Sequence, residues 1–343
     1  MLAVITLLAL GSLDAGAAGS PAIKRAADQI LTHQTADGAI VEGTNPGQSS
    51  KLMPYFANFA ALGLVSAYRQ THNPAYLKAA VRWADWYAGH QNPDGTVNDY
   101  DGTSGSWKST GDYDSTDSYA ATYLDLLLAI SQAGHDRHWL QQKQHSIVKA
   151  VDAIRLTMQP VGLTLAKPTY AVMYTMDNTE TAAGLRSGSA LAAILGMTHE
   201  SLAYLALANR MSAAVSTDLW DPATESYLIG LQPDGFRAKG YAVWYPDVMA
   251  NLLAVAWLPS SERNRQLMGR LKAKFPETIP AAVNTEQDLE NLAWWGWAAI
   301  GAHDHILLAQ IQGKLAKFDV RLKSVSNAAL LGHLCRILAG RQG

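Results

Sequence analysis

The sequence predicts an all-α protein, an (α/α)6 toroid built from six helical hairpins, and three observations support this prediction. Apolar residues recur with helical periodicity in twelve segments of the 343-residue chain. The links between these segments alternate between short and long. A motif at the exit of one helix returns at the exit of another, 57 residues later, at His33 and His90. A helix pair repeated along a chain predicts hairpins that stack side by side.

The predicted helices form six consecutive pairs. In most pairs the second helix is the more apolar or the richer in small residues, whereas the first carries more charge. Helices with little charge belong in the interior, so the second helices should form an inner ring and the first an outer ring. The twelve segments span residues 21–33, 53–71, 74–90, 116–133, 137–157, 178–195, 198–217, 246–258, 260–274, 287–301, 304–318 and 324–339.

Short links follow the inner helices, and most outer helices are followed by long loops. Helices that run alternately up and down collect all the long loops at one end of the toroid. Long loops in a compact domain usually carry function, so the functional site is expected at that end. These loops span residues 34–52, 91–115, 158–177, 218–245 and 275–286.

The repeated motif predicts a tight turn. His33–Ile40 has the sequence HQTADGAI, His90–Val97 has HQNPDGTV, and a shortened copy begins at Leu231. The Asp-Gly dipeptide favours a turn where the helix leads into its loop. We therefore interpret Asp37 and Asp94 as turn residues and not as catalytic groups.

Composition excludes several classes of function. The net charge of −2 gives no support for nucleic acid or an anionic membrane as a partner. A single cysteine, Cys335, excludes an intramolecular disulfide, and the ten histidines show no metal-ligand spacing, so no metal is expected. Ten Trp and fourteen Tyr would suit stacking on sugars, although they would serve equally well in a core.

The N-terminus predicts export. Residues 2–13 form an apolar run of signal-peptide length, followed by small residues that suit cleavage. We predict a secretory signal over residues 1–19, a single domain over 20–343 and a periplasmic or secreted protein; the alternative is that the run is a buried first helix. No later segment is long and apolar enough to span a membrane.

The Asp-Gly turns after outer helices and the Asp-rich starts of inner helices make the chain similar to the (α/α)6-barrel, six-hairpin glycosidase superfamily. The resemblance covers the predicted mature chain at the level of architecture. It implies a carbohydrate substrate, hydrolysis by a carboxylate acid and base, no cofactor and a monomeric enzyme. Inversion is the commoner outcome on this barrel and would require two carboxyl groups roughly 6.5–9.5 Å apart.

Four acidic segments at the starts of inner helices supply the candidates. The first gives Asp117 as a catalytic residue, with Asp112, Tyr113 and Asp114 for substrate binding. The second gives Asp177 and Glu180 as catalytic residues, unless they form a helix-capping pair. Further candidates for substrate binding are Trp107, Arg186, Trp244, Tyr245 and Asp247. In the fourth segment, Thr285 and Asp288 resemble a capping box.

Two alternatives keep the fold and change the function. A polysaccharide lyase or uronate epimerase would take its base from Tyr170 or Tyr174 and would neutralise a uronate with Lys167 or Arg186. A non-catalytic glycan-binding module of an exopolysaccharide export system would use the acidic residues only as helix caps.

Overall fold

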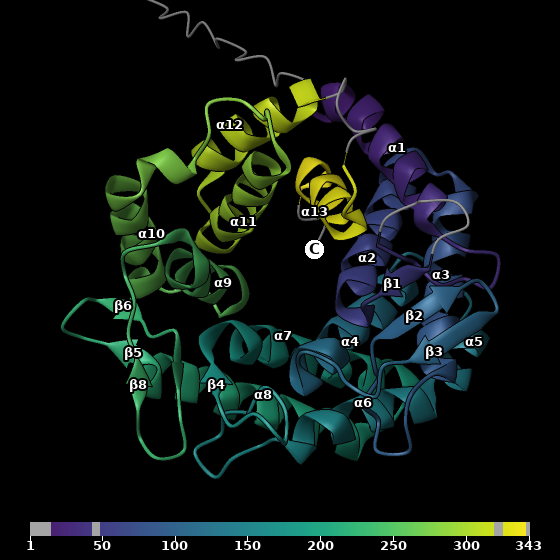
Figure 1. Cartoon of the computed structure of the whole chain (residues 1–343), viewed down its shortest axis with the longest axis horizontal. Coiled ribbons are helices and arrows are strands. Elements are labelled where there is room, and N and C mark those ends of the chain that lie inside the picture. The colour runs from purple at the N-terminus through teal and green to yellow at the C-terminus, as the bar shows by residue number, and fades with distance from the viewer. Residues whose placement is uncertain (1–14, 43–48, 319–324, 341–343) are drawn as a thin grey trace, which may run out of the picture.

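Two concentric rings of helices form the protein (Figure 1). The computed structural model describes residues 15–42, 49–318 and 325–340. Each inner helix packs against the next, and the last packs against the first, which closes the ring. The inner helices are α2 (Pro54–Thr71), α4 (Thr116–Gln132), α7 (Thr175–Leu195), α9 (Met249–Trp257), α11 (Glu286–Ala302) and α13 (Ala328–Ala339).

The outer ring holds the more charged helices, and the predicted toroid is confirmed. One predicted outer helix, 137–157, is divided into α5 and α6 at Lys143. The outer helices are α1 (Ala15–His33), α3 (Pro74–Gly89), α5 (Arg137–Gln142), α6 (Gln144–Leu156), α8 (Thr198–Asp218), α10 (Glu262–Lys274) and α12 (His305–Ala316). Residues 1–14 of the predicted signal lie outside the described residues. No described helix is both long and apolar enough to cross a bilayer.

Small residues bring the inner helices close together. A Cβ atom on Gly63 of α2 would lie 2.3 Å from the Cα atom of Gly332 on α13, so both positions need glycine where the ring closes. Gly184 of α7 meets Ala121 of α4 in the same way, with 2.4 Å to the Cα atom. The small residues of the inner helices therefore serve close backbone packing.

The long loops carry short antiparallel strands that the sequence did not predict. One sheet joins the loops of the first two hairpins, with Lys51 opposite Asp101. Another joins the third and fourth, with Met173 opposite Leu231. The sheets are β1 (Ser50–Leu52), β2 (Tyr100–Thr103) and β3 (Ser106–Ser109); β4 (Met173–Tyr174), β7 (Gly230–Leu231) and β8 (Arg237–Ala238); and β5 (Trp220–Asp221) with β6 (Ser226–Tyr227).

The repeated motif forms the predicted turns. In the first copy the amide of Thr35 donates to the carbonyl of Ala39 at 2.8 Å, and the later copies make the same bond between Asn92 and Thr96 and between Gln232 and Phe236. A fourth copy without aspartate, between Gln159 and Leu163, was missed from the sequence.

Three of these turns dock on the next outer helix. A Cβ atom on Gly38 would lie 2.9 Å from the carbonyl oxygen of Arg82 in α3, and one on Gly95 would lie 2.0 Å from that of Lys149 in α6. The turn of the fourth copy, at Gly162, meets the side chain of Arg210 in α8. The repeat thus marks contacts that join successive hairpins.

Candidate active site

The acidic segments lie where the inner helices begin. Ser115 caps α4 because its hydroxyl accepts a hydrogen bond from the Ser118 amide, and Asp117 follows in the first turn. Helix α7 begins at Thr175, three residues earlier than predicted. Its N-cap residue, Tyr174, makes no side-chain capping bond, and Asp177 lies within the first turn. The capping alternative for Asp177 and Glu180 is therefore wrong.

Four carboxyl groups meet at this end of the barrel, and we call them the carboxylate cluster. They are Asp114, Asp117, Asp177 and Glu180. The pKa of Asp177 lies well above its usual range because of burial and, after burial, the negative charges of Asp117, Glu180 and Asp114. Asp177 still keeps part of its surface exposed. The predicted meeting of the segments 112–117 and 177–180 at one end is thus confirmed.

Glu180 lies one turn beyond Asp177 and is almost completely buried, with 4% of its surface exposed. The hydroxyl of Tyr55 in α2 donates to its two carboxylate oxygens, at 3.0 Å each. Burial raises the pKa of Glu180 to about 8, and the charges of Asp125 and Asp117 add to the rise while the bond from Tyr55 opposes it. Glu180 therefore holds a proton at neutral pH.

Asp117 lies at the base of the cluster and has no exposed surface. One carboxylate oxygen accepts hydrogen bonds from the Ser115 hydroxyl at 2.6 Å and the Ser118 amide at 2.9 Å. The other accepts from the hydroxyl of Thr164, in the loop before α7. Burial raises the pKa of Asp117, against these donors. Because its oxygens face protein groups only, Asp117 is positioned to fix the start of α4 and not to contact a substrate.

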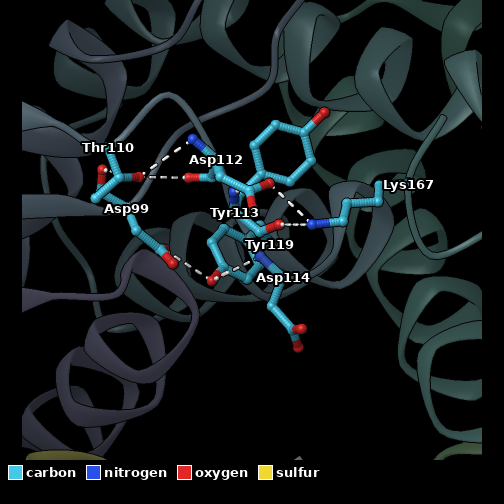
Figure 2. A network of polar contacts seen from close by, with 7 residues as sticks. All are labelled: Asp99, Thr110, Asp112, Tyr113, Asp114, Tyr119 and Lys167. Atoms are coloured by element: carbon cyan, nitrogen blue, oxygen red, sulfur yellow. Dashed lines mark hydrogen bonds and ion pairs between the residues drawn. The ribbon is translucent and has the colours of Figure 1, made fainter. Parts of the chain in front are cut away.

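Asp112 and Tyr113 belong to a polar network that holds the loop before α4 (Figure 2). The Lys167 ammonium lies 2.8 Å from the Asp112 carboxylate and donates to the Tyr113 carbonyl at 2.9 Å. On the other side, the Tyr119 hydroxyl donates to Asp99 at 2.9 Å. Burial, together with the charges of nearby acids, raises the pKa of Asp99 to about 6.

Asp114 differs from the other residues of this network. Its side chain is exposed and points away from the groups drawn around it (Figure 2). Within the described part of the chain, its carboxylate makes no hydrogen bond or ion pair. Asp114 thus offers an accessible carboxylate beside Asp177, whose pKa responds to its charge.

Tyrosines surround the cluster. Tyr245 is 65% exposed, and its pKa is raised by burial of the hydroxyl and then by the charges of Asp114 and Asp177, which places it beside both acids. The hydroxyls of Tyr170 and Tyr174 lie 3.0 Å apart. Tyr55 was missed from the sequence because the start of its helix contains no acid; the only signal was an aromatic residue in the first turn of an inner helix.

Three other predicted residues support loops. Asp247, which is buried, accepts hydrogen bonds from the amides of Ala242 and Val243, at 2.7 and 3.1 Å. The Trp107 indole donates to the Asp37 carboxylate at 2.8 Å, which ties β3 to the first repeated turn. Trp244 packs partly against the core. The predicted capping box of Thr285 and Asp288 is confirmed.

Arg186 lies at the opposite end of the barrel, away from the carboxylate cluster. It donates to the Ser212 hydroxyl at 3.1 Å and to the carbonyl of Trp257, the last residue of α9, at 2.6 Å. It lines a cavity of about 440 Å³ with Arg69, Asp125 and other residues from the C-terminal halves of the inner helices. Arg186 follows Glu180 by less than two turns of α7, and its side chain faces the end of the barrel at which the inner helices terminate.

No group of three or more His, Cys, Asp or Glu residues is placed to hold a metal ion within residues 15–42, 49–318 and 325–340. The pKa values of the buried acids in the carboxylate cluster are set by burial, by one another and by neighbouring hydroxyl groups.

Comparison with solved structures confirms the (α/α)6 fold. A GH63 mannosylglycerate hydrolase from Thermus thermophilus superposes with a TM-score of 0.68 and 12% identity, over 92% of this chain and 99% of its own. A novel alpha-amylase from Clostridium perfringens gives 0.62 and 9%, over 93% and 96%. A rhamnosidase from Klebsiella oxytoca gives 0.59 and 15%, over 89% and 55%. No protein-family model and no curated protein matches the sequence.

Proposed function

We propose that this protein is a glycoside hydrolase in which Asp177 is the general acid and Asp114 the general base. The observation that carries the proposal is the contrast between two neighbouring acids at one mouth of the barrel. The pKa of Asp177 is raised well above its usual range, which favours its protonated form, whereas Asp114 is exposed and has no partner among the described residues. Glycoside hydrolysis needs one carboxyl group in each of these states.

In the proposed reaction, Asp177 gives its proton to the oxygen of the leaving sugar as the glycosidic bond breaks. Asp114 takes a proton from a water molecule, and the oxygen of that water bonds to the anomeric carbon from the opposite face. The proton count balances, and the configuration at the anomeric carbon inverts. Asp117 and Glu180 do not react but raise the pKa of Asp177, because an ionised carboxylate beside Asp177 favours its protonated form.

The fold supports this proposal from a second direction. The solved structures named above are described as a mannosylglycerate hydrolase, an alpha-amylase and a rhamnosidase, three enzymes that act on sugars. In this chain the starts of the inner helices and the long loops lie at one mouth, together with the carboxylate cluster.

A uronate lyase or epimerase has less support. Such an enzyme needs a cation to neutralise the uronate, and Lys167 is already engaged by Asp112 and the Tyr113 carbonyl. Arg186 lies at the other mouth. A purely glycan-binding module would have no need for a carboxyl group with the pKa of Asp177, since burying such a group costs stability.

The test is hydrolysis of a panel of oligosaccharides by the wild type and by Asp177→Asn and Asp114→Asn variants. Loss of a general acid or base costs about 10²–10⁴-fold in kcat. Asp234→Asn is the matched control, because Asp234 is an exposed turn residue on the same side of the barrel. Unchanged hydrolysis by Asp177→Asn would remove the assignment. Proton NMR of the first product tests inversion, since a retained anomer would contradict it.

Export stays part of this proposal. A carbohydrate-degrading role outside the cytoplasm fits the apolar run at residues 2–13. Sequencing the N-terminus of the mature protein checks it: a start near residue 19 is expected, whereas a start at Met1 in an exported sample would contradict cleavage.

A further inference from the structure

A second cavity lies at the same mouth as the carboxylate cluster. It measures about 290 Å³ and is formed by the N-terminal halves of α2, α11 and α13. Tyr55 connects the two sites, because its ring lines the cavity while its hydroxyl binds Glu180. We call this the aromatic–acidic cavity, for the residues that line it.

Aromatic rings form one side of this cavity. Tyr55 and Phe56 meet edge to face with ring centres 5.4 Å apart, and Phe59 meets Trp294 in the same manner at 6.5 Å. Ring faces of this kind bind the apolar face of a sugar, and they also attract a cation through their electron-rich surface.

A buried histidine supplies a hydrogen-bond donor. His333 lines the cavity and is 2% exposed. Its Nδ1 atom accepts a hydrogen bond from the Trp297 indole at 2.9 Å, and burial, with the charge of Arg336, lowers its pKa to about 3. The ring is therefore neutral and carries its proton on Nε2. That nitrogen has no hydrogen-bond partner among the described residues, which leaves its proton for a ligand.

Two carboxylates form the polar side of the cavity. Glu286 accepts from the Ser326 amide at 2.5 Å, and Glu290 accepts from the Gln287 amide group at 3.0 Å. Burial raises the pKa of Glu290, as expected for an acid with no cation beside it. No lysine or arginine appears among the residues lining the cavity. None of the side chains that line the cavity therefore carries a positive charge to balance Glu286 and Glu290.

We propose that the aromatic–acidic cavity binds a sugar residue carrying a free amino group, next to the bond that is cleaved. The ammonium would lie between Glu286 and Glu290 and against the Trp294 ring, and a hydroxyl oxygen of the sugar would accept from His333. This inference rests on the proposed glycosidase function and names its substrate class: a glycan that contains hexosamine without an N-acetyl group.

Calorimetric titration tests the proposal on the full-length Asp177→Asn variant, which removes turnover. The probes are glucosamine, N-acetylglucosamine and glucose trimers. We expect the glucosamine trimer to bind at least tenfold more tightly than the other two. A second substitution, Glu290→Gln, should remove this preference, whereas Glu277→Gln, at an exposed residue that does not line the cavity, should keep it.

Equal or tighter binding of the N-acetylated or neutral trimer would overturn the inference, and this comparison does not depend on how Glu290→Gln folds. Hydrolysis by the wild type is measured separately. Hydrolysis without a preference for the amine removes the inference and leaves the enzymatic function. A preference for the amine without hydrolysis of any substrate removes the function and leaves ammonium recognition.

Discussion

The hydroxyl of Tyr55 donates hydrogen bonds to both carboxylate oxygens of Glu180, at 3.0 Å each. The two residues are 125 positions apart in the sequence. Tyr55 lies in the first turn of α2, and Glu180 lies near the start of α7. The same tyrosine ring forms part of the wall of the aromatic–acidic cavity. Tyr55 therefore joins the acids that control the proton to the cavity proposed to hold the sugar.

We predict that Tyr55→Phe moves the basic limb of the pH–rate profile to higher pH. The phenol stabilises the ionised form of Glu180, so its loss raises the pKa of Glu180 above about 8. The proton shared within the cluster is then retained to higher pH. The measurement is kcat/KM against pH on any substrate that the wild type cleaves.

Tyr68→Phe is the control for this change, because Tyr68 lies on the same helix at its opposite end. A basic limb that stays in place, or one that moves to lower pH, would show that Tyr55 does not control this proton.

We predict that Glu180→Gln makes the protein more stable at alkaline pH. The pKa of Glu180 rises on folding from an ordinary value near 4.5 to about 8. Its contribution to stability is therefore present below pH 4.5 and is lost as the pH rises through about 8, at up to about 1.4 kcal/mol per pH unit. Urea unfolding at pH 5 and pH 8 measures the free energy of unfolding, which should fall less between these two pH values for the variant than for the wild type. An equal fall in both proteins would contradict the assigned pKa.

We predict that Arg186→Met lowers stability and leaves catalysis nearly unchanged. The substitution removes the bonds to the Ser212 hydroxyl and the Trp257 carbonyl, and a bond to a charged group contributes about 1.5–3 kcal/mol. Arg265→Met is the comparison, since its exposed pair with Glu262 is screened by solvent and should contribute little to stability. A large loss of kcat in Arg186→Met, at a temperature where the protein is folded, would place Arg186 in the reaction after all.

The sequence predicted the rings well because the fold follows from patterns that are local. Periodicity, small residues and alternating link lengths specify which helix lies inside, and no distant contact is needed to see them. The meeting of Asp114 with Asp177 was also predictable, since both lie at the starts of inner helices and such helices begin at the same mouth.

The roles within the cluster were less predictable, because they depend on contacts between distant segments. Asp117 was preferred as an acid, yet Thr164 from another loop covers it. Arg186 follows Glu180 by under two turns, and only the length of the barrel shows that they face different mouths. Tyr55 had no acidic neighbour to mark it, and the cavity that it lines requires α2, α11 and α13 to be placed together.

The last prediction concerns two glycines with almost the same backbone conformation. Gly95 has φ of +87° and Gly235 has φ of +89°, and both end a repeated turn. Alanine at either position should cost about 1–2 kcal/mol for the left-handed backbone. At Gly235 nothing lies within 4 Å of the new Cβ atom, whereas at Gly95 it would lie 2.0 Å from the Lys149 carbonyl oxygen.

Gly95→Ala should therefore lower the free energy of unfolding by about 1–3 kcal/mol more than Gly235→Ala does, because the turn must move away from α6. Urea unfolding of the two variants measures this difference directly. The same displacement would move the loop that follows the turn and carries Asp99 and Asp114, so Gly95→Ala should also lose activity while Gly235→Ala keeps it. If the two variants are equally stable, the turn does not dock on α6, and the repeat would then reflect turn formation alone.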